Sequence, residues 1–384
     1  MNVTVVGGGM GGLALAALLS RTGEHHVQLL EQSEGYGQAG YGIGLYPLGA
    51  VVYNAIGQGK ALRDRSVVLK KYEVNGPDAK PIQSVDLATL LTGYGPMLGV
   101  TRSDMIDLLA KSLPAGMIRF GVRAERADLV GDKVVVTTSK HGKIESDIVV
   151  AADGVHSALR QSVFGDVEVY DTGFHAWMWW APVQASQLAT VSEYWGPSAF
   201  VGLYPMRKFV NVAVGIPKEF SPDPQGSTEE IIAALKKVVA EHAPAVAELP
   251  HLWDVAEGRP FLWPMTDVRA PAITALDHRL AFVGDSGVGF LPTAGVGASN
   301  ALRSGAALAY ELSLSSEDSA QAAVSRWEQR VHKLVKGNQA DSRQLAKVMM
   351  VKHQSASVLI NTLMKYMPVT FMTNSIIKSM QEPF

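Results

Sequence analysis

The sequence contains no cysteine among its 384 residues. This absence excludes disulfide bonds, thiol catalysis and iron–sulfur clusters, and it leaves the compartment open. Charge is also scarce, at 18% of residues, and nearly balanced, with a net charge of -2 and a pI near 6.6. Without an excess of basic residues, we expect the chain as a whole to bind neither nucleic acid nor anionic lipid.

Long apolar runs of the kind that cross a bilayer are missing as well. The stretch most similar to a signal sequence, Val3 to Leu19, lacks a basic start and carries five glycines, so we interpret it as part of the mature fold. Hydrophobic residues nevertheless make up 47% of the chain, which is enough for the cores of two or three domains. We expect a cytoplasmic enzyme.

The first informative segment is a glycine-rich run at residues 7–12, GGGMGG. It follows the β-branched run 3–6, which is typical of a buried strand, and it precedes an apolar helical run. This is the context in which the G-x-G-x-x-G pattern binds a dinucleotide. Gly7 permits the tight turn, Gly9 lets a pyrophosphate approach the backbone, and Gly12 allows close packing of helix on strand.

A second expected strand, residues 27–30, ends at Glu31, about 20 residues beyond the glycine run. A carboxylate there would accept hydrogen bonds from a ribose diol, and we place the adjacent Gln32 in the same cofactor-binding set. A glycine-rich turn in some other α/β protein is the alternative. The dinucleotide site is favoured because the strand, the helix and the acidic residue at the end of the second strand all follow in the expected order and spacing.

The second segment is residues 153–160, DGVHSALR, after the apolar strand 148–152. Asp153 stands at the carboxyl end of this strand, where ligands of open α/β sheets gather. Ser157 and Arg160 fall about one helical turn apart, so the hydroxyl can cap the helix while the guanidinium faces a carboxylate or phosphate. Taken alone, Asp-Gly is an ordinary turn, and that alternative stays open.

The third segment begins where the expected strand 279–283 ends, at Gly284 and Asp285. The glycine-containing residues 292–298 then lead into a helical run at 300–308. A carboxylate at a strand end can bind a polyol hydroxyl, and a helix entry of this kind aims bare N–H groups at negative charge. The three segments together predict a single binding site for one dinucleotide.

In order and spacing these motifs resemble the FAD-dependent aromatic hydroxylases, the single-component flavoprotein monooxygenases with the para-hydroxybenzoate hydroxylase fold. The resemblance covers nearly the whole chain and includes residues 42–45 with Pro47, and residues 101–104 before a helix. It implies an α/β architecture: a Rossmann-like FAD-binding domain interleaved with a mixed β-sheet substrate domain, plus C-terminal helices. The expected boundaries are 1–70, 98–170 and 272–330 for the FAD-binding domain, 71–97 and 171–271 for the substrate domain, and 331–384 for the C-terminal helical segment.

The resemblance also implies cofactor contacts. They are Gly7, Gly9 and Gly12 at the pyrophosphate, Glu31 at the adenosine ribose, the backbone near Ala124 at the adenine, Arg102 at the ribityl and phosphate region, Asp285 at a ribityl hydroxyl, Pro292 and Gly295 in the third motif, and the N–H groups of Gly297 and Ala298 at the N1 and O2 edge of the isoalloxazine. Asp153 and Arg160 match a motif that the family uses for flavin and NAD(P)H, and we expect their structural role to be at least as important as any contact with the ligand. No further glycine fingerprint follows a strand, so we expect no dedicated NAD(P)H domain. The resemblance implies that NAD(P)H binds transiently.

Two positions depart from the family pattern. Val288 stands where a histidine is usual, and Ser299 stands where asparagine is frequent. The implied reaction is hydroxylation of an aromatic or polycyclic small molecule with NAD(P)H and dioxygen through a flavin hydroperoxide, a species that survives only in a dry, apolar chamber. Two alternatives stay open: an FAD-dependent reductase or dehydrogenase of an unsaturated or prenyl substrate, and a flavin-binding module without turnover.

Aromatic residues in the middle of the chain are candidates for that chamber. Residues 174–181 read as a strand whose alternation places His175, Trp177 and Trp179 on one face. Core packing is the alternative role for each aromatic. His175 is a weak candidate base for a phenol proton, with a structural role as its alternative. The expected substrate-pocket set is Trp177, Trp179, Phe200, Trp263 and Pro292.

The end of the chain, from Trp327, reads as apolar helices broken at Pro368. We expect these helices to pack on the two domains, and contact with a membrane surface is the disfavoured alternative. The pattern contains no metal-binding motif, so we expect no metal.

Overall fold

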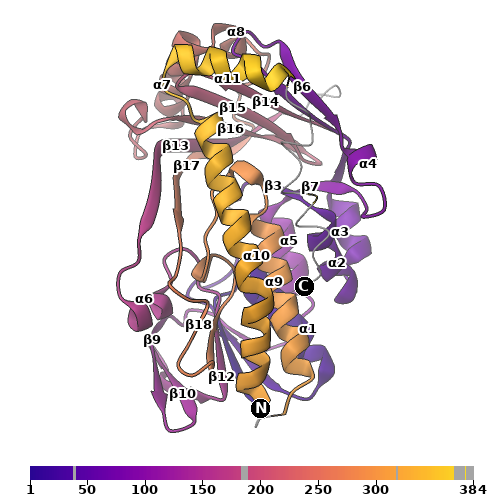
Figure 1. The fold of residues 1–384 in the computed structure, drawn as a ribbon, viewed down its shortest axis with the longest axis vertical. Coiled ribbons are helices and arrows are strands. Elements are labelled where there is room, and N and C mark those ends of the chain that lie inside the picture. The colour runs from indigo at the N-terminus through magenta and orange to yellow at the C-terminus, as the bar shows by residue number, and fades with distance from the viewer. Residues whose placement is uncertain (38–39, 183–188, 317–318, 367–376, 378–384) are drawn as a thin grey trace.

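The computed structural model describes residues 1–37, 40–182, 189–316, 319–366 and 377. In space, two large sheets lie at opposite ends of the long axis of the fold, as far as the described residues show it (Figure 1). The long helix α10 (Ala320–Met349) runs alongside both. Its first turns pack Trp327 into the core of one end, while Met349 packs into the core of the other.

The first sheet has six strands among the described residues, in the order β18-β19-β12-β1-β2-β8. From β12 to β1, β2 and β8 all neighbours are parallel, and β19 is parallel to β12. The chain leaves β1 in one direction and returns at β12 on its other side, which makes their carboxyl ends a switch point where ligands bind. The strands are β1 (Asn2–Val6), β2 (His26–Leu30), β8 (Ile118–Arg119), β12 (Ile148–Ala151), β18 (Thr274–Ala275) and β19 (Leu280–Phe282).

Both faces of this sheet are covered, which explains why its inner strands β12 and β19 are apolar along their whole length. The helices α1 (Met10–Thr22) and α9 (Gly297–Ser313) pack on one face. A small antiparallel sheet packs on the other face with α6 (Ala158–Phe164) beside it. Its strands are β9 (Ala124–Val130), β10 (Lys133–Thr138) and β11 (Gly142–Ser146).

The second large sheet, with seven described strands, has the order β17-β13-β16-β15-β14-β5-β6. Its neighbours are antiparallel except for the parallel pair β14 and β5. One face packs on α7 (Thr228–His242), which starts with the expected capping box of Ser227 and Glu230. The strands are β5 (Lys71–Asn75), β6 (Pro81–Asp86), β13 (Val169–Pro182), β14 (Thr190–Gly196), β15 (Ala199–Pro205), β16 (Phe209–Pro217) and β17 (Glu257–Val268).

Shorter elements join the two ends. A small sheet in the order β3-β7-β4 lies between them, and α11 (Gln354–Tyr366) packs on β6 and β14. The remaining elements are β3 (Gly42–Leu45), β4 (Val67–Leu69), β7 (Met97–Thr101), α2 (Pro47–Ala55), α3 (Gly59–Arg65), α4 (Leu87–Leu90), α5 (Arg102–Ala110), α8 (Pro244–Ala247) and short 3₁₀ helices at Lys218–Phe220, Gly284–Ser286 and Pro292–Ala294.

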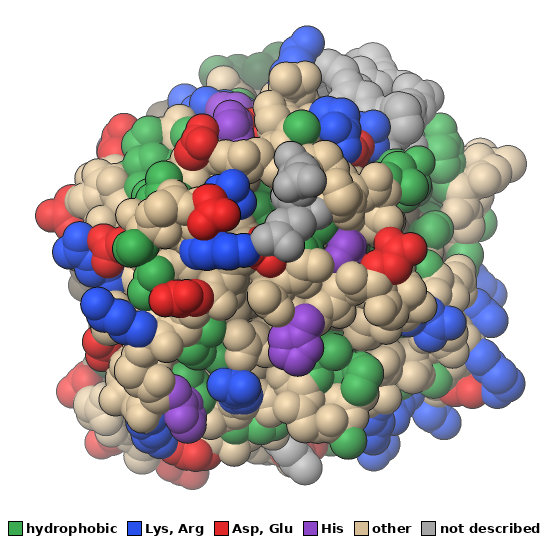
Figure 2. All heavy atoms as spheres, turned by 90° about the horizontal axis from the view of Figure 1, so that it is seen from below, with side chains coloured by type: hydrophobic (Ala, Val, Ile, Leu, Met, Phe, Trp, Pro, Cys, Tyr) green, Lys and Arg blue, Asp and Glu red, His purple; other side chains and the backbone are tan. Residues whose placement is uncertain are grey.

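The architecture confirms the expected fold class, an interleaved α/β chain with C-terminal helices. The break expected at Pro368 lies outside the described residues. Within the described ranges, no helix combines the length and apolar character needed to cross a bilayer. Seen from below in Figure 2, the face at the first sheet's end carries acidic and basic side chains interspersed with one another.

Candidate cofactor site and substrate cavity

The three glycine-containing segments meet at one edge of the first sheet. Backbone hydrogen bonds fix this meeting: the N–H of Gly7 donates to Leu30 O at 2.8 Å, and that of Ala152 donates to Val6 O at 2.7 Å. The N–H of Val283 donates to Ala151 O at 2.8 Å. The structure therefore brings the glycine run, Glu31, Asp153 and Asp285 together at the carboxyl ends of adjacent strands.

The glycines of the first segment differ in what requires them. Gly7 has φ of +106°, and a Cβ there would lie 2.3 Å from Ala152 O. A Cβ on Gly12 would lie 2.2 Å from Gly7 O, so the helix can pack on the strand only without a side chain. A Cβ on Gly9 would meet no described protein atom closer than 3.8 Å. Gly9 therefore leaves open space beside the start of α1, where no side chain caps the helix and the N–H groups are bare.

Glu31 lies beside this turn. Its Oε2 accepts a hydrogen bond from Gly8 N at 2.7 Å, and its Oε1 accepts from Ser33 N and Ser33 Oγ at 2.8 Å each. A carboxylate has about four acceptor sites, so one more donor fits. Gln32 next to it is exposed, and Ala124 is buried at the start of β9.

Tyr36 is a residue of this region that the sequence motifs do not mark. Its hydroxyl is buried without a hydrogen-bond partner among the described residues, and it lies 2.3 Å from where a Cβ on Gly8 would stand. Burial raises the pKa of Tyr36, as does the nearby Glu31, whereas Arg102 opposes the shift. The phenol therefore keeps its proton at neutral pH and offers a donor beside the glycine turn.

Asp153 and Arg160 join the second segment to the third. Arg160 donates through Nη1 to Ser286 O at 2.7 Å and through Nη2 to Val155 O at 2.5 Å. The Oδ2 of Asp153 accepts from Leu159 N at 3.3 Å, while its Oδ1 is buried without a partner among the described residues. Burial raises the pKa of Asp153. Arg160 is thus tied mainly to backbone, and Asp153 keeps one unused acceptor.

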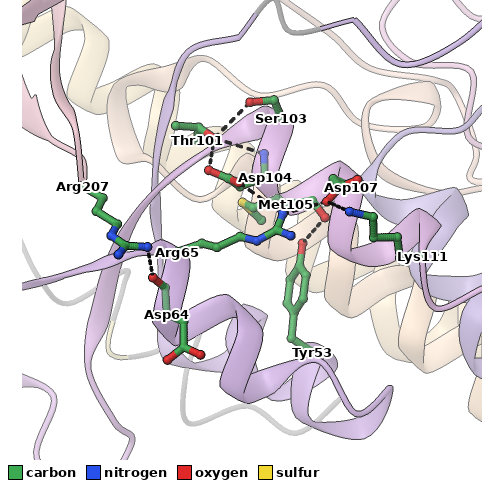
Figure 3. A network of polar contacts seen from close by, with 10 residues as sticks. All are labelled: Tyr53, Asp64, Arg65, Thr101, Ser103, Asp104, Met105, Asp107, Lys111 and Arg207. Carbon is green, nitrogen blue, oxygen red and sulfur yellow. Dashed lines mark hydrogen bonds and ion pairs between the residues drawn. The ribbon is translucent and has the colours of Figure 1, made fainter.

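Arg102 is the first residue of α5, whose start is firmly held (Figure 3). The side chain of Thr101 accepts from Asp104 N at 3.0 Å. Arg65 of α3 bonds Asp104 at 3.3 Å and Asp107 at 2.7 Å. This network fixes the position from which the Arg102 side chain extends.

The carboxyl group of Asp285 interacts electrostatically with the positive charge of Arg102. Burial raises the pKa of Asp285 to about 6, while the positive charges of Arg102 and Arg160 act to lower it. Its side chain is exposed although protein atoms surround it, because it lines a cavity. Beyond it, α9 begins at Gly297 without a side-chain cap, so bare N–H groups of this helix point toward the same space.

The cavity has a volume of about 280 Å³ and extends from the third segment to the seven-stranded sheet. Among the residues expected at the cofactor, it is lined by Asp285, Pro292, Gly295, Gly297 and Ala298; among those expected at the substrate, by Phe200, Trp263 and Pro292. Apolar side chains such as Met178, Met265 and Met349 make up much of the rest.

The assignment of Trp177 and Trp179 to the substrate pocket is corrected. Both indoles lie on the opposite face of β13, packed against α7 in a separate core. Trp177 donates to Ser221 Oγ at 3.0 Å, and Trp179 donates to Leu252 O at 3.2 Å. The alternation of the strand was recognised, but the cavity lies on the other face, beside Ala176 and Met178.

His175 shares the face of Trp177 and does not line the cavity. Burial and the nearby Lys218 lower the pKa of His175. The structure therefore removes it from reach of a substrate in this cavity. Val288, at the position where the family pattern usually has a histidine, is 2% exposed and packs in the same buried core as Trp327.

Glu193 is a cavity residue that the sequence motifs missed. It is 3% exposed on β14, and its carboxylate accepts from Tyr72 Oη at 2.5 Å, Tyr204 Oη at 2.7 Å and Trp195 Nε1 at 3.0 Å. Burial raises the pKa of Glu193, opposed by these three donors. The sequence offers one signal for Glu193, which is that it is a lone acidic residue in a strand with aromatic neighbours. The strand pattern alone does not place this residue at a cavity.

Fold and site together define a dinucleotide-binding flavoprotein class. A family model described as FAD binding domain matches residues 1–337, and the chain belongs to this family. Salicylate hydroxylase of Pseudomonas putida is 27% identical over 335 residues, covering 79% of this chain and 74% of that protein. The 6-hydroxynicotinate 3-monooxygenase of Bordetella bronchiseptica is 32% identical over 178 residues, 46% of each chain.

Solved structures show the same fold over the full length. Klebsiella pneumoniae HpxO complexed with FAD and uric acid superposes with a TM-score of 0.88 at 20% identity, covering 100% of this chain and 97% of that one. A salicylate hydroxylase substrate complex gives 0.78 at 19% identity, with 100% and 98% coverage. This chain is an FAD-dependent monooxygenase of the aromatic hydroxylase family.

Proposed function

We propose that the protein hydroxylates an aromatic or polycyclic small molecule inside the cavity, with NAD(P)H as transient reductant and dioxygen as oxygen donor. The observation that carries this proposal is the cavity itself. One continuous space is lined by Asp285 and the start of α9 on one side and by the apolar face of β13, β15 and β17 on the other. Cofactor and substrate would therefore share a single cavity.

The residues present fit FAD. Space beside Gly9, the bare start of α1, and the unpartnered atoms Asp153 Oδ1 and Tyr36 Oη are features that a dinucleotide would use. We assign the pyrophosphate to the turn at Gly7, Gly9 and Gly12, the ribose to Glu31 with Gln32 beside it, the adenine to the backbone near Ala124, and the ribityl chain to Arg102 and Asp285. Bound FAD would supply the electron transfer and dioxygen activation that side chains cannot perform.

The chain's own residues would then position the cofactor and shield the reacting atoms from water. Bare N–H groups at Gly297 and Ala298 would stabilise negative charge on the adjoining edge of the cofactor. Apolar side chains around the cavity would exclude water, which shortens the life of reactive oxygen donors. Residues 1–70, 98–170 and 272–330 would thus form the cofactor domain, and 71–97 with 171–271 the substrate domain.

The test is oxidation of NADH or NADPH by purified, FAD-loaded protein with a panel of phenols, N-heteroaromatics and polyketides. We expect oxidation that is stimulated by a binding compound and matched by formation of an oxygenated product. Product formation under strict anaerobiosis would instead favour the reductase or dehydrogenase activity. Protein that binds no flavin when FAD is in excess would end the proposal.

A further inference from the structure

The charged groups that line the cavity are acidic. Among the described lining residues there is no lysine, arginine or histidine, and the two ionisable acids are Asp285 and Glu193. The positive charges of Arg102 and Arg160 act on Asp285, at the cofactor side of the cavity. On the side of the seven-stranded sheet, a substrate carboxylate would therefore meet no lining cation and would face Glu193, which costs free energy in an apolar cavity.

Most other polar groups of the lining are already occupied. Asn211 Oδ1 accepts from Gly42 N at 2.6 Å, and its Nδ2 donates to Trp179 O and Val212 O. Thr293 donates to Ser342 O at 2.7 Å. On the side of the seven-stranded sheet, the polar lining groups include Glu193 together with Tyr72 and Tyr204, which we call the Glu193 cluster. Tyr46 also lines the cavity near this cluster, and burial and Glu193 raise the pKa of Tyr46, so its hydroxyl stays uncharged.

The hydrogen bonds within the Glu193 cluster determine which hydrogen-bonding groups it can offer to a ligand. Trp195 Nε1 can only donate, and it shares Oε2 with the hydroxyl of Tyr72, while Tyr204 donates to Oε1. Because both tyrosine hydrogens point at the carboxylate, the lone pairs of both phenol oxygens remain for other partners. Burial and the adjacent Glu193 raise the pKa values of Tyr72 and Tyr204 well above the ordinary value, so both stay protonated. The cluster therefore presents acceptors.

We propose that the Glu193 cluster selects the substrate: an uncharged or cationic aromatic molecule that donates a hydrogen bond through N–H or O–H, and not an aromatic carboxylate. This inference deepens the proposed function and rests on it for the identity of the chamber. The ring would lie among the apolar side chains, and its donor would bond Tyr72 Oη or Tyr204 Oη. The negative charge of Glu193, fixed behind the phenols, would favour a positively polarised donor.

The test measures binding without turnover, on the FAD-loaded protein in the absence of NAD(P)H, by ligand-observed NMR titration at pH 7.5. Two matched pairs isolate the two features. In 1-methylindole a methyl group replaces the N–H hydrogen of indole, which removes the donor, and 4-hydroxybenzamide and 4-hydroxybenzoate differ in the carboxylate charge. We expect indole and the amide each to bind at least about tenfold more tightly than their partners, which corresponds to one well-placed hydrogen bond or one unpaired charge.

The Glu193→Gln variant tests the cluster directly. Its amide would accept from one phenol and donate to the other, which frees a tyrosine hydrogen to point at the ligand and cancels an acceptor. We expect the indole preference to fall by about tenfold. Glu73→Gln, the same change on β5 outside the cavity lining, is the matched control and should leave it unchanged. If Glu193→Gln fails to fold, Tyr204→Phe, which removes a single hydroxyl, replaces it.

Tighter or equal binding of 4-hydroxybenzoate, equal binding of 1-methylindole, or no binding by indole and the amide would each overturn the inference. An unchanged indole preference in the cluster variant would do the same. FAD content and NAD(P)H oxidation are measured separately, so a protein that keeps the ligand preference but oxygenates nothing would contradict the proposed function alone.

Discussion

The guanidinium of Arg160 donates a hydrogen bond to the backbone oxygen of Ser286 at 2.7 Å, across 126 positions of the chain. Ser286 in turn donates to Ala151 O at 2.6 Å, at the end of β12. These bonds join the second and third segments to each other and to the end of β12. Arg160 therefore holds the loop that carries Asp285 in place, whatever contact it makes with a ligand.

Replacing Arg160 with lysine tests this holding role. Lys keeps the positive charge but loses the planar fork that bonds two backbone oxygens at once. We expect a loss of about 1–3 kcal/mol in the free energy of unfolding of the FAD-free protein. Denaturant unfolding measures it. An Arg160→Lys protein with wild-type stability and weakened FAD binding would assign the residue to the ligand instead.

Gly9 and Gly12 provide a paired test of the glycine turn. Gly9→Ala should change the stability of the FAD-free protein by less than about 0.5 kcal/mol, because its Cβ has room. The same methyl would stand in the pyrophosphate space, and we expect FAD affinity to fall at least about tenfold. Gly12→Ala would force backbone apart and should cost about 3 kcal/mol of stability or more. Thermal unfolding and flavin titration compare the two, and full FAD affinity in Gly9→Ala would place the phosphates elsewhere.

Asp285 gives the FAD-free protein a pH dependence of defined sign. The folded pKa of about 6 lies above the ordinary value of 3.8, so the folded state binds more protons between these values. Stability contributed by this group therefore falls as pH rises through the window, and the loss persists above pH 6. Asp285→Asn should be more stable than the wild type at pH 7.5, with a difference that shrinks toward pH 4.

The same Asp285→Asn change should weaken FAD binding, because the acceptor loses its charge. Stability and affinity are thus expected to move in opposite directions. Melting temperatures of FAD-free proteins across pH, with flavin titrations at pH 7.5, check both. A variant less stable than the wild type at every pH would contradict the burial argument.

The two faces of β13 predict different consequences of substitution. Ala176→Leu places extra volume in the cavity and should weaken binding of indole by about tenfold. Trp179 lies on the other face, stacked on Trp253 with ring centroids 5.9 Å apart. Trp179→Phe should lower stability by about 1–3 kcal/mol and leave ligand affinity unchanged. Loss of ligand affinity in Trp179→Phe with unchanged stability would reverse the assignment of faces.

The sequence was sufficient for the parts of the fold where local chemistry and position coincide. The glycine run, Glu31, Asp153 and Asp285 all follow strands, and parallel strands bring their carboxyl ends to one edge. Convergence of these residues was therefore predictable from chain order. Their contacts with FAD stay predictions.

The substrate side was not predictable in the same way. Alternation along β13 separates two faces but does not tell which one packs on α7 and which one meets the cavity, since both are apolar. Trp177 and Trp179 were assigned to the wrong face for that reason. Glu193 depends on tyrosines 121 and 11 positions away in the chain, a relationship that no local pattern contains.

The most direct test of the account is mass spectrometry of the product formed by the FAD-loaded protein with NAD(P)H under ¹⁸O₂, using the tightest-binding aromatic donor from the ligand titrations as substrate. The account predicts one oxygen atom from dioxygen in the product and no product without dioxygen. A product that carries no labelled oxygen, or that forms equally well under anaerobiosis, would contradict it.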